Sequence, residues 1–180
     1  SSQNCTECAK GSFNAVSERT SLCELCHKGT IQPELGQVTC NDCSPGKYVD
    51  VRGQEDCIDC ANGTASGDQG RPEACEECEA GTSQDKEGQL SCVDCPAGKF
   101  QSLEGQETCP PCANGTSNAD TKRNSPCEGC AEGTIQPKTG QAVCNVCSPG
   151  KYVDARGQEK CINCASGTAS GDQGRPEACE

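Results

Sequence analysis

Cys43-Ser44-Pro45-Gly46-Lys47-Tyr48 is the stretch that decides the fold, because its frame recurs along the whole chain. Cys43 closes a Cys-x-x-Cys motif, a glycine follows three residues later, and the next motif opens at Cys57. The motif spacings are 18, 17 and 17 residues, and this triplet then recurs. Spacing this regular is typical of a repeat array. The complete motifs begin at Cys5, Cys23, Cys40, Cys57, Cys75, Cys92, Cys109, Cys127, Cys144 and Cys161, and Cys179 opens a further one.

The spacing predicts one continuous array over residues 1–180, built from three types of module. First-type modules span 18 residues and start at Cys5, Cys57, Cys109 and Cys161. Second-type modules start at Cys23, Cys75, Cys127 and Cys179, and third-type modules start at Cys40, Cys92 and Cys144. Three modules (18+17+17) make a 52-residue unit, so the units are 5–56, 57–108, 109–160 and the partial unit 161–180. Residues 22–76 match residues 126–180 at 42 of 55 positions, which indicates a longer repeat of 104 residues.

The composition does not provide the material for an ordinary core. Of the 180 residues, 21 are cysteine, and the chain has no Trp, no Met, two Tyr and two Phe. Cysteine at this density indicates a disulfide scaffold, in which covalent bridges replace buried apolar area. Such bridges persist in oxidising compartments, so we expect an extracellular or cell-surface protein.

The net charge and the hydropathy exclude two further classes of protein, nucleic-acid-binding and membrane-spanning. The net charge of −12 argues against nucleic acid, whose phosphates require clustered Lys and Arg. No apolar run of about 18 residues is present, so we expect no membrane contact within this segment. The sequence shows no charged-then-apolar stretch either, so we expect no signal peptide within this segment. Because a disulfide protein must be secreted, we expect the sequence to be a mature piece of a longer chain, with its signal peptide outside this segment.

Glycine recurs three residues after the second cysteine of each complete motif, where it predicts a sharp turn. These glycines are Gly11, Gly29, Gly46, Gly63, Gly81, Gly98, Gly115, Gly133, Gly150 and Gly167. Gly-Gln pairs at Gly36, Gly53, Gly88, Gly105, Gly140 and Gly157 predict a second turn. Only short extended pieces fit between two turns. We therefore expect a small disulfide-rich all-β protein: an elongated rod or solenoid of stacked short hairpin modules, without helices or a conventional hydrophobic core.

The residue two positions after each turn glycine is the expected point of burial in a module. In third-type modules it is always aromatic and always follows a lysine, at Tyr48, Phe100 and Tyr152. If each module rotates by about a third of a turn, these three rings share one side of the rod and form lateral contacts. The alternative is that each ring only shields its own disulfide.

The third-type frame resembles a known family. Cys-x-x-Cys-x-Pro-Gly-Lys-Tyr followed by Cys-x-x-Cys occurs at 40–60 and at 144–164, and residues 92–112 fit the same pattern. This frame resembles the ephrin-receptor-like cysteine-rich repeat and, more distantly, the first submodule of tumour-necrosis-factor-receptor domains. The resemblance covers essentially the whole chain, although first-type modules keep only the cysteines and the glycine. It implies an extracellular rod of disulfide-linked β-hairpins, and it implies no particular ligand.

Two disulfide pairings fit the spacing, which by itself leaves both open. In one, motifs pair off, with Cys5 bonded to Cys23 and Cys8 to Cys26, and Cys179 is left alone. In the other, which uses every module identically, the second cysteine of each motif bonds to the first of the next. The resemblance implies this second scheme and leaves Cys5 unpaired within the chain. Its bonds are Cys8–Cys23, Cys26–Cys40, Cys43–Cys57, Cys60–Cys75, Cys78–Cys92, Cys95–Cys109, Cys112–Cys127, Cys130–Cys144, Cys147–Cys161 and Cys164–Cys179.

Zinc is the main competing interpretation of the cysteines, because paired Cys-x-x-Cys motifs also occur in zinc ribbons. Zinc sites would group the motifs in twos with distinct linkers, whereas here the linkers are alike. A redox enzyme would carry one such motif in an α/β context. We therefore expect no metal and no cofactor apart from covalent glycans.

Three N-glycosylation sequons are present, at Asn62, Asn114 and Asn4. Asn62 and Asn114 occupy the same turn, 52 residues apart, while Asn4 is the less favourable acceptor because a cysteine lies within its sequon. The alternative is that Asn-Gly is simply turn chemistry, since Ser166 occupies the matching turn.

No catalytic arrangement is found: His27 is the single histidine and the carboxylates are scattered, so we expect no enzyme. The sequence favours a structural extracellular protein: a segment of a disulfide-linked, glycosylated filament, surface fibre, flagellar hair or matrix strand. Its partners would be further copies or other filament subunits. The alternative is a stalk or ligand-binding ectodomain of a receptor or protist surface antigen, with a protein ligand. Near-identical modules favour the fibre.

Overall fold

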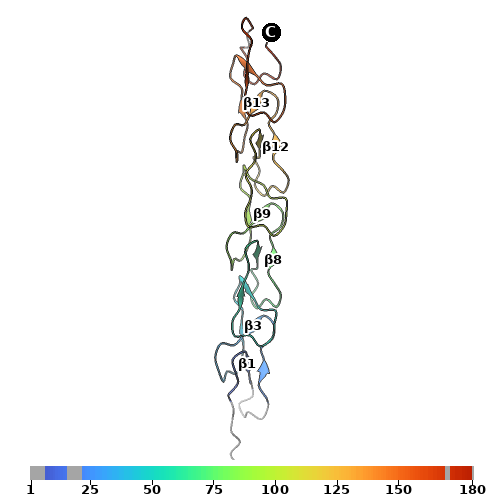
Figure 1. Cartoon of the computed structure of the whole chain (residues 1–180). Coiled ribbons are helices and arrows are strands. Elements are labelled where there is room, and N and C mark those ends of the chain that lie inside the picture. The colour runs from blue at the N-terminus through green and yellow to red at the C-terminus, as the bar shows by residue number, and fades with distance from the viewer. Residues whose placement is uncertain (1–6, 16–21, 169–170, 180) are drawn as a thin grey trace, which may run out of the picture. The chain divides into compact units, whose positions relative to one another are not determined.

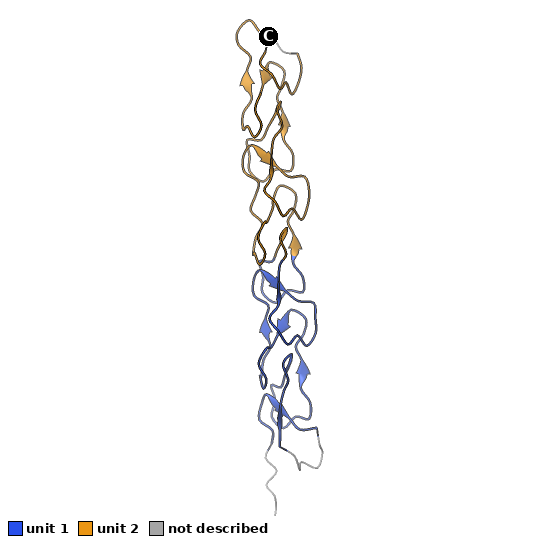
Figure 2. Cartoon of the chain, turned by 90° about the vertical axis from the view of Figure 1, so that its right-hand side faces the viewer, with its two compact units in different colours: residues 1–78, 84–92 blue, residues 79–83, 93–180 orange. Residues whose placement is uncertain are grey.

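The computed structural model describes residues 7–15, 22–168 and 171–179. The described residues contain sixteen two-residue strands and no helix (Figure 1). They form two compact units: unit 1 comprises residues 1–78 and 84–92, and unit 2 comprises residues 79–83 and 93–180 (Figure 2). Within each unit the chain passes from module to module through turns and short strand pairs. This confirms the expected disulfide-rich all-β class built from short hairpins.

The strands fall into two groups. One group follows the turn glycines: β1 (Ser12–Phe13), β3 (Thr30–Ile31), β5 (Lys47–Tyr48), β7 (Thr64–Ala65), β9 (Thr82–Ser83), β11 (Thr116–Ser117), β13 (Thr134–Ile135) and β15 (Lys151–Tyr152). The other lies inside the Cys-x-x-Cys motifs: β2 (Glu24–Leu25), β4 (Asn41–Asp42), β6 (Ile58–Asp59), β8 (Glu76–Glu77), β10 (Val93–Asp94), β12 (Glu128–Gly129), β14 (Asn145–Val146) and β16 (Ile162–Asn163).

Each antiparallel pair joins two successive modules. The first strand follows the turn glycine of one module, and its partner lies between the two cysteines of the next motif. In the β5–β6 pair, for example, Lys47 faces Asp59 and Tyr48 faces Ile58. The hairpins were expected from the sequence. That the Cys-x-x-Cys motif itself supplies the second strand was not.

Among the complete motifs from Cys23 to Cys164, which the structure describes, the one at Cys109 lacks its strand because it contains two prolines. Pro110 and Pro111 fill the interval between Cys109 and Cys112, and proline has no N–H to donate to a ladder. An isolated bridge between Lys99 and Pro111 replaces the strand pair. The N–H of Phe100 still donates to the carbonyl of Pro110, at 3.1 Å, so the two chain segments remain together.

Backbone hydrogen bonds outside the strands also connect the modules. The N–H of Cys60 donates to the carbonyl of Gly46 (2.9 Å), and the N–H of Gly70 donates to the carbonyl of Cys43 (2.8 Å). The same two bonds recur at equivalent positions in both units. Each module therefore satisfies its peptide groups largely through its neighbours, as in other quasi-one-dimensional repeat proteins.

Turn glycines are required by a close approach between modules. Gly46 has a φ of +83°, and a Cβ there would overlap the carbonyl oxygen of Gly88, two modules further along. Gly29 meets Gly70 and Gly98 meets Gly140 in the same way. Only glycine combines this backbone conformation with the absence of a Cβ, which explains its recurrence.

The second turn is present at all six predicted Gly-Gln positions, where each glycine has a positive φ. It also occurs in first-type modules, which have no Gly-Gln pair. There Gly70 (φ +65°), Lys122 (+55°) and Gly174 (+66°) occupy the turn. Lys122 is the single non-glycine residue with positive φ in the described ranges.

The interior contains few apolar side chains. Apart from cysteines, the buried apolar side chains of the described part are Val49, Ala65 and Val153. Many other buried side chains are polar: Ser12, Gln32, Ser66, Thr82, Gln84, Gln101, Asn118 and Gln136. The fold thus has no conventional hydrophobic core over the described residues, as expected, and sulfur atoms occupy the centre instead.

The expected point of burial is wrong by one residue. Most side chains two positions after the turn glycine are only half-buried, whereas the next position is the buried one: Gln32 is 3% exposed and Val49 is 1% exposed. Ser12 and Thr82, directly after their turn glycines, are also buried. Alternation along an extended chain explains the pattern, because neighbouring side chains point to opposite faces. The Tyr48, Phe100 and Tyr152 positions therefore face outward.

Candidate functional site

Ten disulfides form the central feature of the molecule. Each joins the second cysteine of one motif to the first cysteine of the next, with Cα–Cα distances from 5.4 to 5.8 Å. This is the scheme that the resemblance implied. Cys5 lies outside the described residues. The bonds are Cys8–Cys23, Cys26–Cys40, Cys43–Cys57, Cys60–Cys75, Cys78–Cys92, Cys95–Cys109, Cys112–Cys127, Cys130–Cys144, Cys147–Cys161 and Cys164–Cys179.

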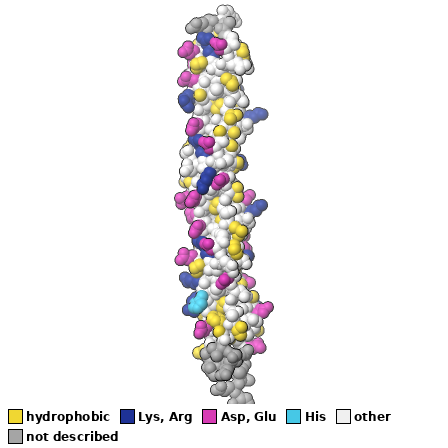
Figure 3. Space-filling view, turned by 180° about the vertical axis from the view of Figure 1, so that it is seen from behind, with side chains coloured by type: hydrophobic (Ala, Val, Ile, Leu, Met, Phe, Trp, Pro, Cys, Tyr) yellow, Lys and Arg dark blue, Asp and Glu magenta, His cyan; other side chains and the backbone are white. Residues whose placement is uncertain are grey.

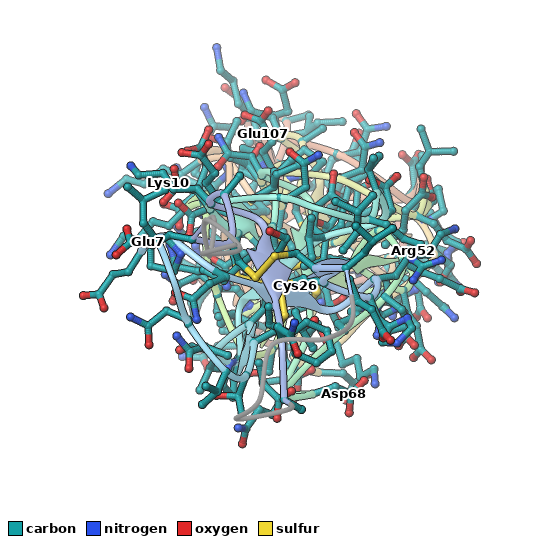
Figure 4. All side chains as sticks on the ribbon, turned by 90° about the horizontal axis from the view of Figure 1, so that it is seen from below. Glu7, Lys10, Cys26, Arg52, Asp68 and Glu107 are labelled. Carbon is teal, nitrogen blue, oxygen red and sulfur yellow. A yellow bond between two sulfur atoms is a disulfide. The ribbon has the colours of Figure 1, made fainter. Side chains whose placement is uncertain are left out.

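In most disulfides the second cysteine of a motif is buried and its partner, the first cysteine of the next motif, is half-buried, while the charged side chains lie outside. Cys26, Cys43 and Cys60 have no exposed surface. Figure 4 shows Cys26 and its disulfide near the middle of the view, with Glu7, Lys10, Arg52 and Asp68 at the periphery. No group of three or more His, Cys, Asp or Glu side chains in the described part is placed to hold a metal ion.

Buried glutamines connect the two sides of the hairpin loops. Gln101 donates from Nε2 to the carbonyl of Thr108 (2.8 Å) and accepts at Oε1 from the N–H of Leu103 (3.0 Å). Gln32, Gln84 and Gln136 make the same pair of bonds with their own loops. Sequence reasoning missed this role. The signal was the recurrence of Gln three residues after the turn glycine in these modules.

First-type modules use an arginine instead of a glutamine to hold their longer loop. The Arg71 side chain is 12% exposed and donates to the carbonyl of Ala74 (3.0 Å), to Oγ of Ser66 (3.2 Å) and to Asp68 (3.0 Å). Arg123 makes equivalent bonds, including one to the carbonyl of Pro126 at 3.0 Å. The repeated Gln-Gly-Arg-Pro-Glu stretches at 69–73 and 173–177 could have indicated this arrangement.

The two described sequons occupy matching turns but differ in exposure. Asn114 is exposed, whereas Asn62 is half-buried and its Oδ1 is buried without a hydrogen-bond partner. In both turns the sequon threonine is bonded to the backbone, Thr64 to the carbonyl of Ala61 and Thr116 to that of Ala113, each at 2.7 Å. Asn4 lies outside the described residues.

The predicted aromatic contacts are half-buried and stand on outward-facing positions. Tyr48 faces Ile58, and Tyr152 faces Ile162, across the β5–β6 and β15–β16 pairs. Ile58 and Ile162 are 49% and 47% exposed. Each pair therefore forms a small apolar patch at the surface of its own unit.

These features define a disulfide-rich all-β repeat protein whose modules share one covalent and hydrogen-bonded frame. The family model described as tyrosine-protein kinase ephrin type A/B receptor-like matches residues 14–53, 63–102 and 81–125. The matches cover more than half of the chain, so the chain belongs to this family of ephrin-receptor-like cysteine-rich repeats. A search of curated proteins finds no match.

Membership of the family sets the general class of the protein. The ephrin-receptor-like repeat is a non-catalytic, extracellular type of module, and the ten disulfides fit that setting. The described ranges contain no helix that is both long and apolar enough to cross a membrane. The class thus covers structural proteins and receptor ectodomains alike.

Proposed function

We propose that the chain is a structural segment of an extracellular filament, such as a surface fibre, flagellar hair or matrix strand. The observation that carries the proposal is the equivalence of the modules. The same disulfide and the same inter-module hydrogen bonds recur in both units, and the 104-residue repeat extends this likeness to the side chains. Equivalent modules suit a fibre, which gains length by repetition, whereas a ligand-binding site is expected to stand out as a distinctive patch.

The proposal includes N-glycans on Asn62 and Asn114. Both sequons lie in turns that precede a strand, β7 or β11, and Asn114 is exposed. Glycans at these turns would keep part of the surface free of protein contacts. Intact-mass measurement of the secreted protein, before and after enzymatic deglycosylation, should show the loss of two glycans. An unchanged mass would remove this part of the proposal.

A receptor role is the second candidate, because the matching family model is named after a receptor. In that case the chain is a stalk or a ligand-binding ectodomain, and its partner is a protein ligand at the cell surface.

Electron microscopy of the native material separates the two candidates. The structural proposal predicts long fibres that contain this chain, which an antibody against a surface loop such as residues 102–107 should decorate at regular intervals. Isolated particles on the cell surface, with no fibres, would contradict the proposal and favour the receptor candidate.

A further inference from the structure

We propose that three outward-facing apolar pairs, Tyr48–Ile58 in unit 1 and Phe100–Pro110 and Tyr152–Ile162 in unit 2, are each a docking site for the side of a second copy of this chain. We call them the apolar rungs. The inference rests on the proposed structural function, to which it adds the partner and the contacting residues.

The apolar rungs differ from every other strand pair in the described part of the chain. At the equivalent places, Phe13 faces Glu24, Ala65 faces Glu76 and Ser117 faces Glu128. The remaining pairs are Ile31 with Asn41, Ser83 with Val93, and Ile135 with Asn145. Each of these contains a polar residue. Apolar residues meet each other only where a third-type module precedes a first-type module, once every 52 residues.

The aromatic rings are not needed to cover the disulfides. Ser83 and Ser117 take the place of the ring in other modules, and their hydroxyl oxygens lie 3.3 Å and 3.2 Å from the sulfur atoms of Cys109 and Cys144, further along the chain. Cys109, which lies against Ser83, is buried. A small hydroxyl side chain therefore serves the fold as well as an aromatic ring does, so the ring has another use.

The polar atoms beside the apolar rungs are available to a partner. Within the described ranges, the hydroxyls of Tyr48 and Tyr152 make no hydrogen bond and no carboxylate pairs with Lys99 or Lys151. Lys47, by contrast, is bonded to Asp59 at 2.8 Å. Proline or asparagine replaces that aspartate opposite Lys99 and Lys151. Aromatic side chains are enriched at protein interfaces, and a tyrosine hydroxyl that has no partner within its own chain is available to bond a partner there.

Charge and repetition both indicate a second copy as the partner. The chain carries 27 acidic against 15 basic residues, so another copy presents carboxylates to the unpaired lysines. Within unit 2, the Phe100 and Tyr152 rungs repeat after 52 residues, as do β9 and β13, which take the same place across the width of that unit in Figure 1. A periodic surface is matched along its length by a partner with the same period. Hydrophobic side chains reach the surface in both units (Figure 3).

The test uses the oxidised, purified chain and a triple variant, Ile58→Asn, Phe100→Ser and Ile162→Asn. Asn41 and Asn145 occupy the same motif position as the two isoleucines, and Ser83 and Ser117 the same position as Phe100, so the fold accepts these residues. The matched control is Ile31→Ser, Val93→Asn and Ile135→Ser, which alters the same positions in other strand pairs. Sedimentation velocity over a concentration series measures association, and circular dichroism and free-thiol counts check the fold.

We expect wild type and control to associate alike and the triple variant to associate at least about tenfold more weakly, as when central interface residues are truncated. Association of the natively folded triple variant at the wild-type level would overturn the inference. An equal loss in the control, or a wild type that stays monomeric, would overturn it as well. None of these results affects the structural proposal, which depends on fibres in the native material.

Discussion

At the scale of single residues, the turn glycines set how closely the modules approach one another. Gly46 and Gly36 both have positive φ angles, +83° and +68°. They differ in surroundings, because a Cβ on Gly46 would overlap the Gly88 carbonyl, whereas the nearest atoms to a Cβ on Gly36 would be side-chain carbons of Glu7 at 3.7 Å. This natural pair separates backbone strain from steric overlap.

Gly46→Ala should destabilise the protein considerably more than Gly36→Ala. Both variants force an alanine into the left-handed region, at a cost of about 1–2 kcal/mol. Gly46→Ala must in addition push the Gly88 turn away and weaken the bonds around it. The midpoint and slope of thermal unfolding, followed by circular dichroism, measure the difference.

Gly67→Ala is the baseline for this comparison. Gly67 is not in the left-handed region, and the nearest atom to a Cβ there would be the Leu90 carbonyl oxygen at 3.6 Å. This variant should unfold close to wild type. Equal unfolding midpoints for the Gly46 and Gly36 variants would show that the close approach contributes nothing to stability.

At the scale of elements, the loop of a first-type module is held by an arginine, whereas the loop of a second-type module is held by a glutamine. The disulfides of these modules span 15 residues, one more than in the other modules. Three residues after the turn glycine, first-type modules have a serine or an asparagine, whereas second-type modules and one third-type module have a glutamine. In first-type modules the arginine extends across the loop instead. Bonds from its guanidinium to backbone carbonyls hold the extra residue in place.

Arg71→Lys should destabilise unit 1 by about 1.5–3 kcal/mol, which is typical of losing hydrogen bonds from a charged group. Lysine keeps the charge but lacks the planar fork that reaches the Ala74 carbonyl and the Ser66 hydroxyl together. Chemical denaturation under oxidising conditions measures the change in the free energy of unfolding.

The control is Arg52→Lys, since Arg52 is exposed and makes no ion pair or hydrogen bond with residues that the structure describes. It should leave the free energy of unfolding unchanged within about 0.5 kcal/mol. If Arg71→Lys behaves like Arg52→Lys, the arginine does not hold the loop.

At the scale of the whole molecule, the disulfides supply the stability that the interior, with few buried apolar side chains, does not provide. Each one closes a loop of 14 or 15 residues and should contribute about 3 kcal/mol in the chain-entropy model. The few buried apolar side chains, Val49, Ala65 and Val153, cannot replace them. Stability in such an array is a sum of local terms.

Reduction of the disulfides should therefore unfold the chain. Circular dichroism and small-angle scattering, before and after treatment with a thiol reductant, are the measurements. Treatment with a metal chelator alone should change neither signal, because the cysteines of the described part are bonded to each other. A reduced chain that keeps its spectrum and dimensions, or an oxidised chain that unfolds in the chelator, would contradict the role of the disulfides.

Much of this architecture follows from the sequence alone. The recurring cysteines, turn glycines and Gly-Gln pairs determine a helix-free array of short hairpins, because backbone constraints are local and depend on residue type. The notable local error was the buried position. Tyr48 and Val49 are adjacent, and both have largely apolar side chains. The residue types alone therefore do not show which of the two faces the interior.

Only the tertiary structure decided how the modules use one another. Both disulfide pairings satisfy the spacing, and the choice depends on Cys43 meeting Cys57 across a strand pair that no single module contains. Other contacts also form between separate segments of the chain. They are the hydrogen bond of Gln101 across its loop, the bond from Arg71 to the Ala74 carbonyl, and the contact of Tyr48 with Ile58. Such contacts depend on which strands pair and on how closely neighbouring turns approach. Both are set only when the modules pack against each other.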